Sequence, residues 1–453
     1  MRVFLAVLCC VMLVLACVAC KPKTSKGVAT QTAAPPAPTE TQASTTGPIK
    51  FGFNLEETGN AATFGISDHK GAELAVNEIN AAGGVMGRQI EAVWGDNASL
   101  SQQSATVAAK LINQDKCDVL IGATTSSNTI AMAKVAEEAK RPMLSPAATN
   151  PSVTLNEDGS ARKYVFRVCF TDDFQGERMA DFAVNGPIKA KQACIFYDAD
   201  SDYSVGIWET IKRVAPAKGL TIVAEDSFLS SSETDFRTKL NKFKGQKFDV
   251  LIVPGYYNQV AMIANQAREM GIKQPMLGGD GWDSPDLWKN AGKNIEGCYF
   301  TNHYAATDQD PAVQDFITKY KAAYGGNVPD AMAILGYDAV KLMADAIARA
   351  GSTDSEAVTA ALASTKDFHG ASGLITINPQ HNADKKLVVI KIGAGGAFEW
   401  SFTYEPGQGG TPAPATPAAA GAPAAGTTPP AAGEAGGGAP PPAEGSKKPG
   451  PTG

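Results

Sequence analysis

Two short turns of small polar residues carry the chemistry that this chain could offer a ligand. Residues 124–127 stand directly before a helical pattern, and residues 146–149 follow a short apolar run. Hydroxyl oxygens at a helix start can cap backbone N–H groups, and the amides left over favour an anion. The second turn has little side-chain bulk, so a small ligand could reach main-chain groups at Ala147 and Ala148 and the Thr149 hydroxyl. Together the turns predict a polar clamp for a carboxylate, although each alone is also typical of an ordinary cap or loop.

A carboxylate that could bind an ammonium group stands at Asp280, within the segment GGDGW. The flanking glycines favour an exposed side chain at this position. Opposite a set of N–H and hydroxyl donors, Asp280 would satisfy a zwitterionic amino acid, because the donors take the ligand carboxylate and Asp280 takes its ammonium. Tyr203, Tyr256 and Tyr257 follow predicted strands and would wall the ligand side chain. A loop role for Asp280 and a packing role for the tyrosines stay open.

Sequence motifs of catalysis are missing from the chain. It contains no G-x-S-x-G, no G-x-x-x-x-G-K-[ST], and no G-x-G-x-x-G after its first strand-like segment. The four histidines are scattered and lack metal-ligand spacing. A hydrolase built from Ser126, His303 and Asp280 is conceivable on a two-lobed fold, but nothing in the spacing brings the histidine near the serine. We therefore expect a binding protein that is not an enzyme, with no cofactor and no metal.

The elements that must position these residues alternate between strand and helix. Residues 119–150 read as a buried strand, a polar turn, an amphipathic helix and a second strand. Similar strand patterns recur at residues 49–53, 89–94, 193–197, 221–225, 249–253, 276–278 and 387–392. Helical patterns separate most of them, and two more cover residues 311–324 and 331–350. This alternation predicts an α/β fold with mostly parallel sheets, in which ligands bind beyond the carboxyl ends of the strands.

Length and composition indicate a globular chain with polar extensions. The 453 residues carry a net charge of −6, and 19% of them are charged, so no basic excess points to nucleic acid. Without its ends the chain exceeds the roughly 250–300 residues at which single cores split, so two lobes are expected. The cysteines beyond the N-terminal segment lack C-x-x-C spacing and favour buried thiols, with a disulfide left open. They are Cys117, Cys169, Cys194 and Cys298.

The two ends of the chain read as segments outside the fold. Arg2 followed by an apolar run over residues 3–16 predicts an export signal, too short to span a membrane. Small residues before Cys17, and again before Cys20, resemble the lipobox of bacterial lipoproteins, with Cys17 the better fit. We therefore expect residues 1–20 to be a signal and lipobox and residues 21–48 to be a flexible linker. Residues 405–453 are rich in Pro, Ala and Gly and predict a disordered tail.

Six segments in sequence order resemble the leucine/isoleucine/valine-binding proteins, which are type I periplasmic solute-binding proteins of ABC transporters. The segments are GAELAVNEINAAGGVMGRQIE, IGATTSS, LSPAATNP, DDFQG, GGDGWDSPDLW and LGYDAVKLMADAIARAGSTD, and the match runs over residues 49–402. The resemblance implies two Rossmann-like lobes joined by a three-strand hinge that closes on the ligand. The crossings would lie near Val168, Thr301 and Asp384. Residues 49–168 and 301–384 would form lobe 1, and residues 169–300 and 385–404 would form lobe 2.

The same resemblance implies a role for individual residues. The ligand carboxylate would be held around Ser126 and by Thr149, and the ammonium by Asp280 and main-chain groups at Ala147. Side chains that match the lining of the family's side-chain pocket are Phe64, Tyr203, Tyr256 and Met332.

The chain departs from the family pattern at three places. Some members carry a tyrosine where Phe64 stands, a glutamate where Asp280 stands, and a disulfide between the loops near Ser99 and Thr125. The resemblance implies a protein that captures an aliphatic amino acid and delivers it to permease subunits, and the lipobox-like cysteines add a lipid anchor at the membrane of the periplasm or cell surface. Other small amides or acids as ligands, and a sensory role, stay open as alternatives.

Overall fold

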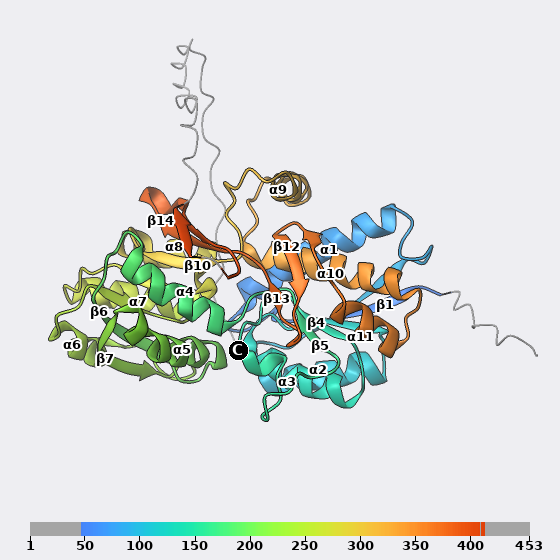
Figure 1. Cartoon of the computed structure of the whole chain (residues 1–453), viewed down its shortest axis with the longest axis horizontal. Helices are drawn as coiled ribbons and strands as arrows, with labels where there is room; N and C mark the ends of the chain where they lie inside the picture. The colour runs from blue at the N-terminus through green and yellow to red at the C-terminus, as the bar shows by residue number, and fades with distance from the viewer. Residues whose placement is uncertain (1–46, 408, 413–453) are drawn as a thin grey trace, which may run out of the picture. The chain divides into compact units, whose positions relative to one another are not determined.

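The computed structural model describes residues 47–407 and 409–412 (Figure 1). The expected export signal, the lipidation candidates Cys17 and Cys20, the linker up to residue 46 and most of the tail lie outside the described residues. Among the described residues the strands form a five-stranded sheet and an eight-stranded sheet, each covered by helices, and a small third sheet with the order β11-β12-β13. We call the five-stranded sheet with its helices lobe 1 and the eight-stranded sheet with its helices lobe 2.

Lobe 1 is built on a five-stranded parallel sheet with the order β2-β1-β3-β4-β5. The expected alternation of strand and helix is confirmed here, with a fifth strand beyond the four predicted units. Its strands are β1 (Ile49–Leu55), β2 (Ile90–Asp96), β3 (Val119–Gly122), β4 (Met143–Ser145) and β5 (Val165–Arg167). The connecting helices are α1 (Ala62–Ala81), α2 (Ser101–Asn113) and α3 (Ser126–Glu138).

The apolar residues of β3 alternate between two hydrophobic clusters, which explains why the strand is buried on both faces. Val119 and Ile121 belong to the cluster that includes α1, whereas Leu120 belongs to the cluster formed by α2 and α3. Successive side chains of a strand point to opposite faces, so a continuous apolar run is what a doubly covered parallel strand requires.

Lobe 2 contains an eight-stranded mixed sheet with the order β16-β15-β14-β10-β9-β8-β6-β7. The strands are β6 (Gln192–Asp198), β7 (Thr221–Phe228), β8 (Val250–Ile252), β9 (Met276–Gly278), β10 (Tyr299–Asn302), β14 (Leu387–Ile392), β15 (Phe398–Tyr404) and β16 (Gly410–Pro412). The helices are α4 (Asp172–Asn185), α5 (Asp202–Lys218), α6 (Arg237–Lys244), α7 (Tyr257–Glu269) and α8 (Pro285–Ala291). The prediction that order ends at Glu405 is wrong for β16, because this strand pairs antiparallel with β15.

The chain passes between the two sheets after β5, after β10, and between β13 and β14. After β10 it returns to lobe 1 through the elements α9 (Pro311–Ala323), α10 (Ala331–Ala350), α11 (Ser355–Ala363), β11 (Phe368–Gly370), β12 (Gly373–Ile377) and β13 (Ala383–Asp384). Figure 1 shows the orange α10 beside the blue α1, and these two helices pack against each other. The predicted lobe boundaries near Val168, Thr301 and Asp384 stay a prediction.

Glycines allow α1 and α10 to approach closely. A Cβ atom on Gly71 would lie 1.8 Å from the Ala333 carbonyl oxygen, and one on Gly336 would lie 2.5 Å from the Asp68 carbonyl oxygen. Any side chain at either position would therefore force the helices apart. This contact sets the position of Phe64 on α1 relative to Met332 on α10.

The four cysteines among the described residues are buried free thiols, as the sequence predicts. Burial raises the pKa of the Cys117 thiol to about 11 and those of Cys169 and Cys194 to about 12. These thiols are therefore protonated at neutral pH and act as small apolar core residues.

Candidate ligand-binding site

One cavity between the lobes gathers most of the residues that the sequence predicts for the site. Lobe 1 contributes α1, the turns after β3 and β4, and the start of α10, whereas lobe 2 contributes α5 and the loops after β8 and β9. The lining residues are Phe64, Thr124, Thr125, Ala147, Tyr203, Tyr256, Asp280, Gly281 and Met332. Ser126, Ala148 and Thr149 lie beside this lining in the same two turns but do not belong to it.

The cavity is nearly closed. Its volume is about 10 Å³, which leaves room for roughly one water molecule. Hydrogen bonds link the lobes across its rim: Tyr257 donates to the Thr63 hydroxyl at 2.9 Å, and Asn258 donates to the Asn60 carbonyl at 2.8 Å. At another edge, Asn150 donates to the Asp202 carbonyl at 2.7 Å. The structure is thus a closed form, and a ligand the size of an amino acid enters only when the lobes separate.

The start of α3 holds the chain's own carboxylate, from Glu56. Its Oε2 accepts the Thr124 N–H at 3.0 Å, while its Oε1 accepts the Thr125 N–H at 3.0 Å and the Thr125 hydroxyl at 2.8 Å. Asn128 donates a further bond to Oε1 at 2.9 Å. The prediction that side-chain oxygens of this turn cap α3 is wrong, because Thr125 occupies the N-cap position without a side-chain cap. An anion does lie at this helix start, but it is the fully buried Glu56.

The turn at residues 146–149 is fixed from below by Arg167 on β5. Its buried guanidinium donates to the Ala148 and Asn150 carbonyls, both at 2.7 Å. These two bonds therefore fix the carbonyls on either side of Thr149. The Thr149 hydroxyl is buried and lies against the Asp172 carboxyl.

Ser126 reaches the same turn from α3. Its hydroxyl accepts the Asn150 N–H at 3.2 Å, which joins the two polar turns. Asp172, at the start of α4, lies next to Thr149 and is fully buried, and burial raises the pKa of its carboxyl well above the usual range. The region around Ser126 and Thr149 therefore offers hydroxyl groups together with a carboxyl that favours its neutral, proton-donating form.

Asp280 is buried rather than exposed, which corrects the sequence prediction. Its exposed fraction is 2%, and its carboxylate accepts hydrogen bonds from Gln175 at 3.0 Å and from His303 Nε2 at 2.9 Å. Gln175 also accepts the Asp280 N–H at 2.8 Å, so both ends of the residue are fixed. Burial lowers the pKa of His303, which keeps the imidazole neutral and leaves the negative charge of Asp280 uncompensated for a cationic ligand group.

The glycines around Asp280 serve the close approach of aromatic rings. A Cβ atom on Gly281 would lie 2.8 Å from the Tyr256 ring and 3.0 Å from the Tyr203 ring. Tyr203 and Tyr256 stack with their centroids 5.1 Å apart, and Phe64 meets Tyr256 edge to face at 5.5 Å. The Tyr203 hydroxyl also accepts the Gly281 N–H at 3.0 Å. Three aromatic rings with Met332 thus form an apolar wall opposite the polar turns.

The hydrolase alternative finds no support in this geometry. His303 Nε2 bonds to Asp280 and its ring stacks on Phe170 at 3.9 Å, while the Ser126 hydroxyl bonds to Asn150. Within residues 47–407 and 409–412, no three His, Cys, Asp or Glu side chains are grouped in a way that could hold a metal ion.

Sequence reasoning missed the residues that support the site. Glu56, Arg167 and Gln175 touch the predicted residues directly, and only Gln175 had been noticed, within the segment DDFQG. Glu56 directly follows an apolar strand pattern and Arg167 interrupts one, and a charge in such a position is the signal that could have marked them.

Two α/β lobes that enclose a cavity lined by one carboxylate, polar turns and aromatic rings define a solute-binding protein. A family model described as "Periplasmic binding protein" matches residues 48–397, so the chain belongs to this family, as the resemblance predicted. A curated relative, Leu/Ile/Val-binding protein homolog 3 of Brucella melitensis, is 32% identical over 330 residues, which cover 72% of this chain and 86% of the relative.

Solved structures extend the comparison to the fold. A leucine-binding protein, LivK, of Thermotoga maritima is 35% identical with a TM-score of 0.74, and the match covers 79% of this chain and 99% of that protein. The branched-chain amino acid transporter substrate-binding protein LivJ of Streptococcus pneumoniae, solved with isoleucine, is 36% identical with a TM-score of 0.72, covering 78% and 99%. All three of these relatives are described as binding proteins, so the chain belongs to a class of binding proteins and not of enzymes.

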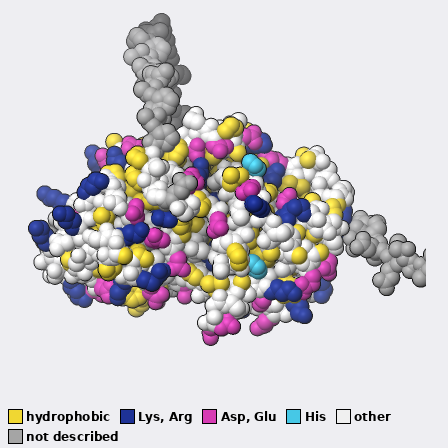
Figure 2. Space-filling view, in the orientation of Figure 1, with side chains coloured by type: hydrophobic (Ala, Val, Ile, Leu, Met, Phe, Trp, Pro, Cys, Tyr) yellow, Lys and Arg dark blue, Asp and Glu magenta, His cyan; other side chains and the backbone are white. Residues whose placement is uncertain are grey.

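Figure 2 shows acidic and basic side chains interspersed over the visible face. Across the part of the chain that the structure describes, each helix is too short or too polar to serve as a membrane span.

Proposed function

We propose that this protein captures leucine, isoleucine or valine between its lobes and delivers it to the membrane permease of an ABC transporter. The observation that carries the proposal is the pairing, in one buried cavity, of the Asp280 carboxylate with an aromatic and thioether wall. A carboxylate suits the ligand ammonium, and an apolar wall suits a branched aliphatic side chain. The names of the relatives, several of which are Leu/Ile/Val-binding proteins, support the same ligand class.

The proposed pose follows from the polar groups around the cavity. The ligand ammonium lies at Asp280 and the Ala147 main chain, and the ligand carboxylate faces Ser126 and Thr149. The Thr149 hydroxyl and the neighbouring Asp172 carboxyl, whose pKa burial raises, support this orientation, since both groups can donate to an anion. Phe64, Tyr203, Tyr256 and Met332 then enclose the side chain.

Calorimetric titration tests the proposal. The purified protein is unfolded and refolded to remove any ligand carried through purification, and is then titrated with the twenty amino acids and a few short amides. Binding of leucine, isoleucine or valine at micromolar concentration or tighter is the expected result. Binding of a solute that is not an amino acid would contradict the role given to Asp280, and binding of none would contradict the ligand class.

Lipid anchoring is part of the same proposal and rests on the sequence around Cys17 and Cys20. Acylation at either cysteine would hold the binding domain at the outer face of the membrane beside the permease. Expression of the wild type and of Cys17→Ser and Cys20→Ser variants, followed by membrane fractionation and intact-mass measurement, identifies the modified cysteine. A fully soluble wild-type protein without added lipid mass would refute the anchor.

A further inference from the structure

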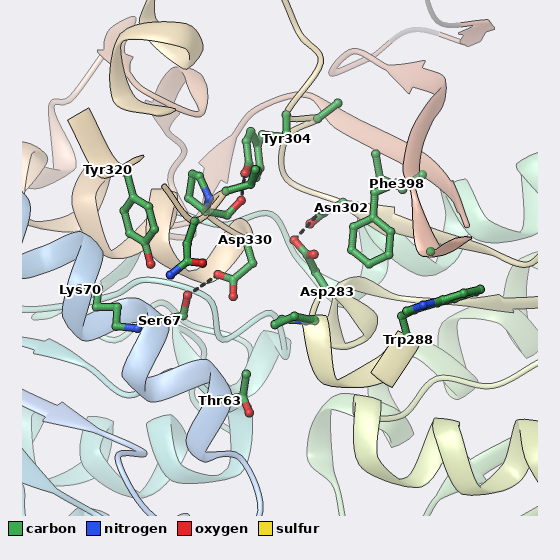
Figure 3. Close-up of a pocket in the computed structure, with 18 of the residues that line it drawn as sticks. Thr63, Ser67, Lys70, Asp283, Trp288, Asn302, Tyr304, Tyr320, Asp330 and Phe398 are labelled. Atoms are coloured by element: carbon green, nitrogen blue, oxygen red, sulfur yellow. Dashed lines mark hydrogen bonds between the residues drawn. The ribbon is translucent and has the colours of Figure 1, made fainter. Parts of the chain in front are cut away.

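A second and much larger cavity, of about 770 Å³, lies beside the candidate ligand site (Figure 3). Both lobes line it: α1 and the start of α10 from lobe 1, and α8, β14 and β15 from lobe 2. The loop that follows β10 and leads back to lobe 1 completes the wall. Small-molecule sites typically span about 300–1,000 Å³, so this cavity has the size of a binding site.

Two carboxylates stand at the centre of this cavity. Asp283 is 3% exposed and its Oδ2 accepts hydrogen bonds from Asn302 at 2.8 Å and from the Ala331 N–H at 2.7 Å. Asp330 accepts the Ser67 hydroxyl at 2.5 Å and caps α10. Figure 3 shows both acids on the cavity wall, with Lys70 beyond Ser67 at one end. Burial and the neighbouring Asp330 raise the pKa of Asp283 to about 7, so the centre of the cavity becomes more negative as the pH rises through this value.

The other end of the cavity is aromatic and its mouth is apolar. Trp288 on α8 and Phe398 on β15 lie together at this end (Figure 3). At the mouth, Ile66 is 42% exposed and Val328 is 57% exposed, although most large apolar side chains among the described residues are buried. Such exposed apolar groups next to a buried acid indicate a ligand with an apolar body and a cationic head.

We propose that this cavity is a second small-molecule site, which binds a primary amine carrying an aromatic or branched aliphatic body. The ammonium lies between Asp283 and Asp330, where its positive charge offsets the repulsion between the two acids. The body lies over Trp288 and Phe398, which offer apolar contact and a face for the adjoining cation. No residue of this site lines the smaller cavity, so the two ligands would occupy separate sites.

The two cavities nevertheless share three elements. Ser67 and Phe64 come from α1, Asp283 and Asp280 frame the same 3-10 turn, and Asp330 stands two residues before Met332 at the start of α10. An occupant of the larger cavity touches both lobes and therefore biases the equilibrium between open and closed forms. By linkage, each ligand then changes the affinity for the other by the same factor.

The test uses 2-phenylethylamine as the probe, titrated calorimetrically into the purified protein at pH 8, where Asp283 is ionised. Saturable binding of one equivalent is expected. Asp283→Asn and Trp288→Leu should each weaken the affinity for 2-phenylethylamine about ten- to hundredfold, because one charged contact or one aromatic face is lost. Matched controls are Asp198→Asn, which alters another acid of 3% exposure, and Trp208→Leu, which removes a tryptophan of α5 outside the cavity. Both should bind the probe like the wild type.

Two further arms separate this site from the smaller cavity. Asp280→Asn should leave probe binding intact, and 2-phenylethanol, which has the same body without the charge, should bind at least tenfold more weakly. Absence of saturable heat, equal binding of the alcohol, or loss of probe binding in Asp280→Asn but not in Asp283→Asn would each overturn the proposal. If Asp283→Asn does not fold, Trp288→Leu and the alcohol still decide the question, and neither depends on the identity of the ligand in the smaller cavity.

Discussion

Replacing Glu56 by glutamine isolates the contribution of a buried anion at the start of α3. The carboxylate is fully buried and accepts four hydrogen bonds, from the Thr124 and Thr125 N–H groups, the Thr125 hydroxyl and Asn128. Glutamine keeps one acceptor oxygen and turns an amide NH₂ towards the donors on the other side. Glu56→Gln therefore loses at least one charged hydrogen bond and leaves a backbone N–H unpaired.

The expected cost can be assembled from these contacts. A lost hydrogen bond to a charged group contributes about 1.5–3 kcal/mol, and the loss of charge at the helix N-terminus adds about 0.3–1 kcal/mol. We expect Glu56→Gln to lower the free energy of unfolding by about 2–4 kcal/mol in urea titration. Ligand binding should weaken as well, because Ser126 on the same helix turn faces the proposed ligand carboxylate.

The neighbouring Glu57 supplies a matched control. Its side chain is partly exposed and pairs only with His69, so Glu57→Gln should change the free energy of unfolding by less than about 1 kcal/mol. A Glu56→Gln protein that unfolds at the same urea concentration as Glu57→Gln would refute the view that Glu56 organises this helix start.

Four further predictions concern the site and the hinge. Thr149→Ala and Asp280→Ala should each weaken amino-acid binding by about 1.5–3 kcal/mol in calorimetry, because a charged hydrogen bond is lost. Arg167→Met should lower the free energy of unfolding by about 3–5 kcal/mol in urea, since buried carbonyl partners lose their donors. Burial lowers the pKa of His303, so the unfolded chain binds the proton more readily and the free energy of unfolding falls as the pH drops below 6.5. In His303→Gln, urea titrations should show a smaller decrease over this pH range. Burial also lowers the pKa of Lys385 to about 8 from 10.5. The free energy of unfolding of the wild type should therefore rise by about 2 kcal/mol between pH 8 and 9.5 relative to that of Lys385→Met.

Each of these predictions has an outcome that contradicts it. Unchanged affinity in Thr149→Ala or Asp280→Ala removes that residue from the binding site. If Arg167→Met has the same free energy of unfolding as the wild type, water replaces the guanidinium as donor to the two carbonyls. Parallel pH profiles of variant and wild type would show that His303, or Lys385, titrates alike in the folded and unfolded chain.

The regular elements were predictable because their apolar periodicity is local. The helical pattern at residues 331–350 matches α10, and the strand patterns at residues 276–278 and 387–392 match β9 and β14. β16 could not be predicted, because its Gly-Thr-Pro sequence has no strand pattern and the strand depends on pairing with β15.

The site was predictable in part, for a related reason. Strand ends and glycines point to Asp280 and the tyrosines, and the structure brings them into one cavity. The partners of Asp280 are far away in sequence: Gln175 is separated from it by 105 residues. Pairings of that kind depend on how the two lobes meet, which no local pattern encodes. For the same reason no local pattern predicts that Glu56, separated from Thr124 by 68 residues, accepts the free N–H groups of Thr124 and Thr125.

The hydrogen bonds that already join the lobes across the rim have a consequence for affinity. Tyr257 with Thr63, and Asn150 with Asp202, stabilise the closed form whether or not a solute is inside. The observed dissociation constant is the intrinsic one divided by the fraction of molecules in the binding-competent form. These contacts therefore change the observed affinity although they never touch the solute. Evolution could therefore tune this protein to scarce or abundant nutrient by changing rim residues alone, while the chemistry that chooses the solute stays fixed.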